Sequence, residues 1–181
     1  LMCDESFSPI INEELKVFHA TYPDAQVTPQ YINELDAFNA LKQMKVNLII
    51  AARNFRPDEI EYFNSHKLYP RYFPIGYDGL AFICNNQNTD SCITVENIKR
   101  ILKGEVKTWG EINKGSKLGE IDVVFDNNKS AAVHYAVDSI LGGVPINSPN
   151  ITAVNTSAEV INYVEKTPNS IGVIGSNWLN D

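Results

Sequence analysis

Helical and extended patterns alternate along the whole chain, and this alternation limits the folds that the chain can adopt. Apolar residues recur at helical spacing in some stretches and form short continuous runs in others. The predicted strands are 26–32, 46–51, 68–75, 79–84, 121–125 and 170–174. Two predicted helices start at Pro9, with Ser8 as the N-cap, and at Pro57. The other predicted helices span 34–44, 95–102, 131–141 and 157–165. Strands that alternate with helices favour an α/β fold with mainly parallel sheets flanked by helices.

The composition narrows the classes of partner. The 181 residues are 44% hydrophobic, which is enough for one domain or for two small lobes. The net charge is −7 and no basic block offsets it, which argues against a nucleic acid or an anionic membrane as partner but allows a local anion site. No apolar run reaches the roughly 18 residues of a membrane-spanning helix. We expect that an export signal has been removed upstream of Leu1.

The segment 93–112, with the sequence ITVENIKRILKGEVKTWGEI, combines a short amphipathic helix with a turn that leads to a tryptophan. Thr94 is the predicted N-cap, and Gly104 is the predicted end of the helix. One apolar face of the helix is formed by Ile98, Ile101 and Leu102. We expect Trp109 to be buried in a core, so the segment has a structural role and no chemistry of its own.

This segment and five further landmarks resemble, in the same order, the phosphate-binding subunits of bacterial phosphate ABC transporters. The matching residues of the segment are Ile98, Ile101, Leu102, Gly104, Val106, Trp109, Glu111 and Ile112. The other landmarks lie at 1–9, 47–59, 75–85, 123–141 and 170–175. The resemblance implies a type II periplasmic binding-protein fold, in which two lobes, here 1–76 and 77–181, close around a cleft. It also implies that a segment returning to the first lobe lies outside this chain.

The resemblance implies a binding protein and not an enzyme. The chain is expected to capture an inorganic oxyanion, with phosphate as the first choice, and to present it to an ABC permease in the membrane. We expect an exported monomer in the periplasm or at the cell surface, with any lipid anchor upstream of this chain, and neither a cofactor nor a metal. In agreement, His19, His66 and His134 stand singly, and the sequence has no nucleophile elbow, P-loop or dinucleotide fingerprint.

Three loops that open helices are the candidate anion-binding elements, because helix N-termini, hydroxyl groups and a guanidinium group hold oxyanions well. By the resemblance, the predicted ligand-binding residues are Ser6, Phe7, Arg53, Ser130, Ala131 and Ala132. Ser6 would donate its hydroxyl and Phe7 its backbone N–H. The alternatives are that Ser6, Ser8 or Ser130 only cap helices, that Arg53 is a surface residue, and that Lys129 is a solvated charge.

Several departures from the family pattern bear on the ligand. Asp126 stands where many members carry an arginine, and Ala131-Ala132 replaces a Gly-Thr, which removes a hydroxyl donor. Arg53 is the nearest match to the aspartate that accepts the proton of monohydrogen phosphate in the best-known members, so the positive anchor has moved to the first lobe or the ligand differs. Glu34, in place of a Gly-Ser-Gly loop, is unfavourable beside an anion. These departures leave open a ligand-sensing or protein-interaction domain on the same scaffold that does not bind phosphate.

The three cysteines are compatible with an exported protein. Cys84 and Cys92 bracket a polar run short enough to bring them together, so both a disulfide and two separate thiols are possible. Cys3 is not expected to carry a lipid, because the preceding Leu1-Met2 lacks the small residue that such processing sites prefer.

Overall fold

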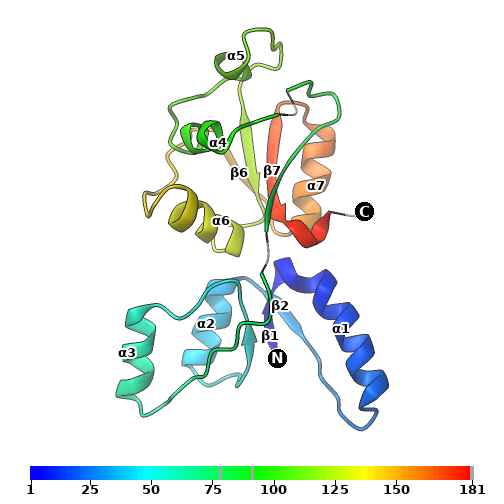
Figure 1. Ribbon diagram of the computed structural model, residues 1–181, viewed down its shortest axis with the longest axis vertical. Helices are drawn as coiled ribbons and strands as arrows, with labels where there is room; N and C mark the ends of the chain where they lie inside the picture. Colours follow the sequence, from blue (N-terminus) through cyan, green and yellow to red (C-terminus); the bar gives the residue numbers. More distant parts are fainter. Residues whose placement is uncertain (78, 91, 180–181) are drawn as a thin grey trace.

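The computed structural model describes residues 1–77, 79–90 and 92–179, which form two lobes stacked along the long axis (Figure 1). Each lobe has its own sheet: three strands in the order β2-β1-β3 and four strands in the order β4-β7-β5-β6. All strand pairs are parallel except β4 with β7. The structure therefore confirms an α/β fold with mainly parallel sheets flanked by helices.

The first lobe is built around its central strand. β1 (Met2–Asp4) pairs with β2 (Gln30–Ile32) on one side and with β3 (Ile49–Ile50) on the other. The helices are α1 (Ser8–Thr21), α2 (Glu34–Lys42) and α3 (Pro57–Ser65). Phe38 of α2 and Phe63 of α3 are buried, and both make edge-on contacts with the ring of Phe55 at 5.5 and 5.6 Å between centroids. This aromatic cluster fixes the loop between β3 and α3 against the two helices.

The second lobe has helices on both faces of its sheet (Figure 1). Its strands are β4 (Leu80–Cys84), β5 (Asp122–Phe125), β6 (Ile151–Ala153) and β7 (Ser170–Gly175). Its helices are α4 (Val95–Leu102), α5 (Trp109–Ile112), α6 (Ala131–Tyr135) with a π-helical continuation over Ala136–Ile140, and α7 (Ser157–Lys166).

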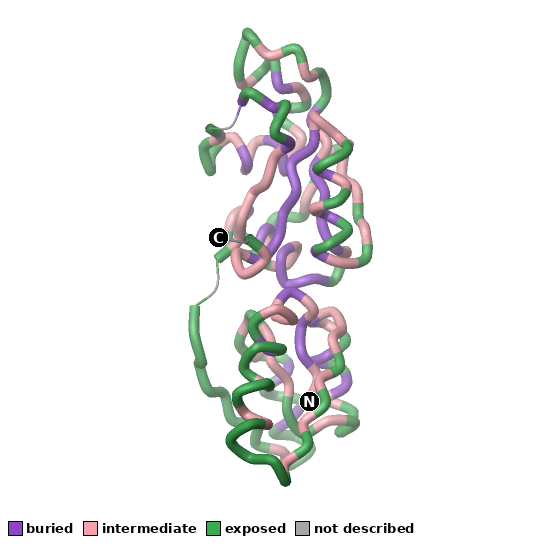
Figure 2. Tube along the Cα trace, turned by 90° about the vertical axis from the view of Figure 1, so that its right-hand side faces the viewer, coloured by how far each residue is buried: buried purple, intermediate pink, exposed green. Residues whose placement is uncertain are grey.

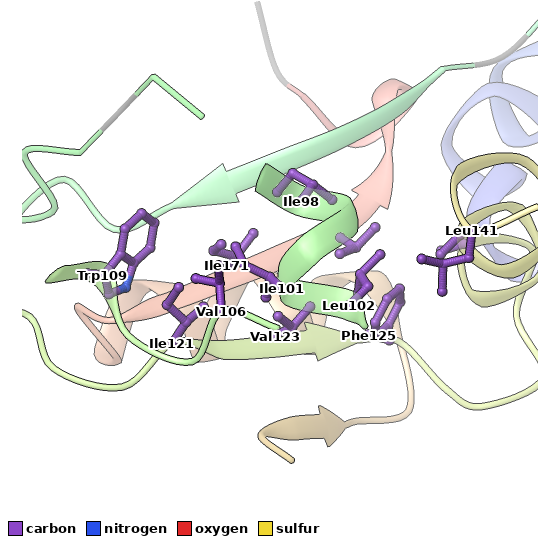
Figure 3. Packing of buried hydrophobic residues seen from close by; sticks show 13 residues of the cluster. Ile98, Ile101, Leu102, Val106, Trp109, Ile121, Val123, Phe125, Leu141 and Ile171 are labelled. Atoms are coloured by element: carbon purple, nitrogen blue, oxygen red, sulfur yellow. The ribbon is translucent and has the colours of Figure 1, made fainter. Parts of the chain in front are cut away.

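Side-chain alternation along β5 and β7 divides the second lobe into two hydrophobic cores. Val123, Phe125, Ile171 and Val173 face the helix α4 and Trp109 (Figure 3). The opposite core contains Val124, Val160, Val164 and Ile174, and it is covered by α7. Because successive strand residues point to opposite faces, the continuous apolar runs of β5 and β7 serve both cores.

The segment 93–112 has the predicted structure. Thr94 Oγ1 accepts a hydrogen bond from Asn97 N at 3.2 Å, and Gly104 follows the helix with a φ of +75°. The φ of Gly104 and the carbonyl of Asn147, which a Cβ would approach to 2.7 Å, both favour glycine. Trp109 is fully buried.

Some predicted elements are wrong or shorter than expected. Residues 68–75 form no strand; they run as an extended segment along one side of the first lobe, exposed over most of its length (Figure 2). Pro70 and Pro74 lack the N–H that a sheet ladder requires, which explains the absence of pairing. The strand predicted at 46–51 is reduced to β3, and the N-cap of α1 is Phe7 rather than Ser8. The short elements α5 and β6 were not predicted.

All three cysteines are free thiols, so the disulfide between Cys84 and Cys92 is not formed. Cys3 is fully buried in β1, where burial and the neighbouring charge of Asp4 raise its pKa to about 12. Among the described residues, no helix combines the length and hydrophobicity needed to cross a bilayer.

Candidate ligand-binding site

The predicted ligand-binding residues gather where the two lobes meet. Ser6 and Phe7 lie in a 3₁₀ turn (η1, Glu5–Phe7) directly after β1, and Arg53 lies in the loop after β3. Ser130, Ala131 and Ala132 follow β5 and open α6. The strands β1, β3 and β5 therefore all direct their carboxyl ends towards the lobe boundary, which is where parallel α/β sheets usually carry their binding sites.

Direct hydrogen bonds cross this boundary. The carbonyl of Ser6 accepts from Asn177 Nδ2 at 2.7 Å and from Trp178 Nε1 at 3.0 Å, both in the turn η3 (Ser176–Trp178). Glu5 Oε2 accepts from Ser157 Oγ at 3.1 Å, at the start of α7. Figure 2 shows buried residues of both lobes meeting here. These contacts hold the two lobes close together.

Longer ion pairs flank the hydrogen-bonded part of the boundary. Lys129 Nζ lies 3.8 Å from Asp36 Oδ1, and Arg56 Nη2 lies 3.7 Å from Asp138 Oδ2. All four side chains are about half exposed, so solvent weakens both pairs. Lys129 is thus paired across the lobes, although weakly, rather than simply solvated.

The hydroxyl of Ser6 is already engaged by a carboxyl group that was not predicted. Ser6 Oγ and the Ser6 N–H both donate to Asp4 Oδ1. Asp4 is 1% exposed, and its Oδ2 has no hydrogen-bond partner among the described residues. Burial raises the pKa of Asp4 to about 6, and the charges of Glu34 and Asp126 add to that rise. Ser6 caps no helix; Asp4 caps the 3₁₀ turn instead.

Arg53 is held by two carboxylates of its own lobe. Its Nη1 and Nη2 donate to the two oxygens of Glu59 at 2.8 and 2.9 Å, and its Nε lies 3.4 Å from Glu34 Oε2. The guanidinium also stacks over the ring of Phe38 at 3.7 Å. Burial would lower the pKa of Arg53, but the hydrogen bonds and charges of Glu59 and Glu34 outweigh it and raise that pKa. With 15% of its side chain exposed, Arg53 is not a surface residue.

Glu34 connects the first lobe to the second. It is completely buried at the start of α2, and its Oε1 accepts from the backbone N–H groups of Ala52 and Arg53 at 2.9 and 3.2 Å. Its Oε2 accepts from Nδ1 of His134, on α6, at 2.8 Å. The carboxylate of Glu34, which we expect to be unfavourable beside an anion, therefore lies at the centre of the lobe boundary.

On the second-lobe side, Ser130 caps α6. Its Oγ accepts from Val133 N at 3.2 Å, and its hydroxyl is hydrogen-bonded to the carboxyl group of Asp126. Asp126 is 2% exposed, and burial raises its pKa despite the hydrogen bond from Ser130. Ala131 and Ala132 are buried in the first turn of α6. Ser130 therefore does cap α6, and its role as a ligand donor stays a prediction that requires its hydroxyl to release Asp126.

The boundary is rich in carboxyl groups. Asp4, Glu5, Glu34 and Asp126 lie there together with the cation Arg53 and the imidazole of His134. In the described parts of the chain, no three His, Cys, Asp or Glu side chains are arranged to hold a metal ion. A cavity of about 380 Å³ between Glu120 and Asn150 lies at another edge of the second lobe and contains none of the predicted residues.

Sequence reasoning missed the partners of the predicted residues. Asp4 and Glu5 lie at the carboxyl end of β1, and that position is a signal for a role at the site. His134 stands singly in the predicted helix 131–141 and carries no such signal. Asn177 and Trp178 carried no local signal, because only the closure of the two lobes brings them to Ser6.

Comparison with known proteins places nearly the whole chain in one family. A family model described as a PBP superfamily domain matches residues 2–181. A phosphate-binding protein PstS of Borreliella burgdorferi is 26% identical over 180 residues, and the match covers 93% of this chain and 60% of that protein. A phosphate-binding protein PstS of Staphylococcus haemolyticus is 19% identical over 172 residues, covering 94% of this chain and 54% of that protein. The chain thus spans little more than half the length of these relatives.

Solved structures show the same fold. A putative phosphate ABC transporter substrate-binding protein with bound phosphate from Clostridium perfringens superposes with a TM-score of 0.80 at 22% identity, over 99% of this chain and 71% of that chain. An ABC-type phosphate transport receptor from Vibrio cholerae gives a TM-score of 0.69 at 19% identity, over 99% of this chain and 72% of that chain. At these identities the likeness concerns the fold.

Proposed function

The chain belongs to the family described as the PBP superfamily domain. On that premise, we propose that it is the ligand-capturing part of an exported solute-binding protein for an inorganic oxyanion. Phosphate is the first choice, because the relatives from Borreliella burgdorferi and Staphylococcus haemolyticus are phosphate-binding proteins by name. The protein would act as a monomer in the periplasm or at the cell surface and hand the anion to an ABC permease. It would bind without catalysis, cofactor or metal.

One observation carries the proposal: Arg53 lies at the boundary of the two lobes, and its buried Nε has only a carboxylate at 3.4 Å and no hydrogen bond among the described residues. Nε of Arg53 makes no hydrogen bond within the described residues, although its Nη atoms are paired with Glu59. A buried guanidinium N–H without a partner favours an anion nearby. The other donors that we propose are the backbone N–H groups of Phe7, Ala131 and Ala132. The hydroxyls of Ser6 and Ser130 would join them by exchanging their present acceptors, Asp4 and Asp126, for the anion.

The two lobes, 1–76 and 77–181, are proposed to close on the anion. The proposed division between residues 76 and 77 lies at the end of the exposed segment 68–77, and residue 78 lies outside the described residues. The hydrogen bonds from Ser157, Asn177 and Trp178 to the turn η1 would form when the lobes come together. Oxyanion capture would then be coupled to lobe closure.

A thermal unfolding series tests the proposal. Protein dialysed free of phosphate is unfolded with phosphate, arsenate, sulfate or molybdate, and a ligand at 100 times its dissociation constant should stabilise the folded state by roughly 2.7 kcal/mol. Stabilisation by phosphate and arsenate alone would support phosphate capture. If no anion stabilises the protein, the chain is better described as a sensing or docking domain on the same scaffold.

A matched pair of variants tests the role of Arg53. Arg53→Lys keeps the positive charge but removes the planar fork of donors, so phosphate stabilisation should fall. Arg71→Lys makes the same change in the exposed segment 68–77 and should leave phosphate stabilisation as in the unmodified protein. Equal stabilisation of the two variants would remove Arg53 from the site.

A further inference from the structure

We propose that Glu34 is a resident anion of the cleft: its carboxylate occupies donors beside Arg53 that can hold a free oxyanion, and the oxyanion binds by displacing it. This inference rests on the proposed function, because it concerns the same site. It adds a residue that determines the affinity of that site.

The first argument is the set of donors around Glu34. Two consecutive backbone N–H groups, of Ala52 and Arg53, converge on Oε1, and Nδ1 of His134 donates to Oε2. Nε of Arg53 lies 3.4 Å from the same Oε2 without hydrogen-bonding geometry. Adjacent backbone N–H groups with a guanidinium and an imidazole beside them form a concave anion site. A side-chain carboxylate fills this one.

The second argument is that the donors come from both lobes. Ala52 and Arg53 belong to the loop after β3 in the first lobe, and His134 belongs to α6 in the second. The carboxylate of Glu34 therefore bridges the lobes as a bound anion would. Because the side chain of Glu34 is only 1% exposed, its carboxylate can leave these donors only when the lobes separate.

The third argument is the charge balance. Arg53 is already shared by Glu34 and Glu59, and the carboxyl groups of Asp4 and Asp126 lie close by. A second anion added beside Glu34 would face these carboxyl groups with no uncompensated cation among them. The repulsion is relieved when the oxyanion takes over the donors of Glu34 and the carboxylate moves out of the boundary.

Competition of this kind weakens the observed affinity. A site that is free for only a small fraction of the time binds its ligand more weakly by that fraction. Removing the charge of Glu34 should therefore tighten oxyanion binding, whereas removing a residue that merely orients Arg53 should weaken it. The sign of the change distinguishes the two roles.

The test compares phosphate binding by titration calorimetry in the unmodified protein and in Glu34→Gln. The neutral amide keeps the size of the side chain, and we expect phosphate to bind at least about tenfold more tightly. Glu111→Gln is the matched control, because Glu111 also accepts two consecutive backbone N–H groups, of Lys107 and Thr108, but lies on α5 in the second lobe. Its phosphate affinity should equal that of the unmodified protein.

A second variant keeps the proposal testable if Glu34→Gln does not fold. Glu34→Asp retains the charge but shortens the side chain, so it cannot reach the Ala52 and Arg53 amides and His134 together. It should also tighten phosphate binding, by a smaller factor. Folding of each variant is checked by circular dichroism before the titration.

The outcomes separate the inference from the proposed function. Tighter binding by the Glu34 variants supports the inference, even if the unmodified protein binds too weakly to measure. Phosphate binding by the unmodified protein that is unchanged or weaker in the variants overturns the inference alone. If neither the unmodified protein nor the Glu34 variants bind any oxyanion, both the inference and the proposed function are wrong.

Discussion

Ser6 donates both its hydroxyl and its backbone N–H to one oxygen of Asp4, and the other oxygen of Asp4 is buried without a partner. An ionised carboxylate in that position has one oxygen that no described N–H or O–H group reaches, which disfavours the charged form. The nearby carboxyl groups of Glu34 and Asp126 disfavour the charge further. Asp4 is therefore one described group at the lobe boundary whose charge should change near pH 6.

Substituting Asp4 with Asn should reduce the pH dependence of stability. Burial raises the pKa of Asp4 from 3.8 to about 6, so the folded protein keeps a proton that the unfolded chain has released between these values. The contribution of protonated Asp4 to the free energy of unfolding is present below about pH 4 and is lost as the pH rises through 6, about 3 kcal/mol in all.

Urea unfolding at pH 5 and pH 8 measures this effect. The unmodified protein should lose more stability between the two pH values than Asp4→Asn does. Asp24→Asn, at an exposed position, serves as the control and should behave like the unmodified protein. Equal losses in all three proteins would mean that another group titrates.

Arg53→Ala should destabilise the first lobe strongly. The substitution leaves the buried carboxylates of Glu34 and Glu59 without their cation, and breaking a buried ion pair in this way costs about 3–5 kcal/mol. Arg71→Ala, in the exposed segment, should change stability by less than about 0.5 kcal/mol. Denaturant unfolding checks both, and a cost for Arg53→Ala as small as that of the control would show that water reaches the two carboxylates.

Trp109→Ala should destabilise the second lobe. The indole is fully buried, and its Nε1 donates to the carbonyl of Asn169 at 2.9 Å. Loss of a buried tryptophan typically costs about 3–5 kcal/mol. Val95→Ala, on the exposed side of α4, is the control. Melting temperatures that fall by the same amount in both variants would contradict the role of Trp109 in the core.

Gly172→Ala should also destabilise the second lobe, because of crowding. An added Cβ would lie 2.7–2.8 Å from side-chain atoms of Val164, Ile83 and Val160, and overpacking of a core costs about 1–3 kcal/mol. Gly110→Ala is the matched substitution in an open position of α5, and it should be neutral or stabilising. Urea midpoints ranked in the opposite order would refute this packing argument.

Substitution of the N-cap residues Ser130 and Thr94 distinguishes helix capping from ligand binding. Ser130→Ala and Thr94→Ala each remove a side chain that accepts from a helical N–H at 3.2 Å, so each should cost about 1 kcal/mol of stability. Under the proposed function, only Ser130→Ala should also weaken phosphate binding, since Thr94 caps α4 in the outer part of the second lobe. Equal phosphate affinities would leave Ser130 as a cap alone.

The sequence predicted the elements whose signals are local. Within a dozen residues, the sequence contains the cap at Thr94, the apolar face of α4 and the stop at Gly104, and the structure has all three. The stretch 68–75 was predicted as a strand from its apolar residues, but its two prolines prevent regular pairing. β6 is too short to stand out, because it has only three residues.

The site was harder to predict than the fold. The order of the landmarks located the loops that carry Ser6, Arg53 and Ser130, and these loops do meet at the lobe boundary. Their partners could not be inferred, because the contact of Glu34 with His134 spans 100 residues and depends on how the lobes close. Polar pairing across a domain boundary leaves no periodic signal in either segment.

The hydrogen bonds from Asn177 and Trp178 to the carbonyl of Ser6 join residues that are 171 and 172 positions apart. During synthesis, the turn after β1 must therefore wait for almost all of the described chain before its carbonyl finds these donors. The first-lobe sheet can form early, because β1, β2 and β3 all lie between Met2 and Ile50. The second-lobe sheet needs its inner strand β7, which ends at Gly175, directly before these donors. The sheet of the second lobe and the lobe boundary are therefore completed together, long after the first-lobe sheet.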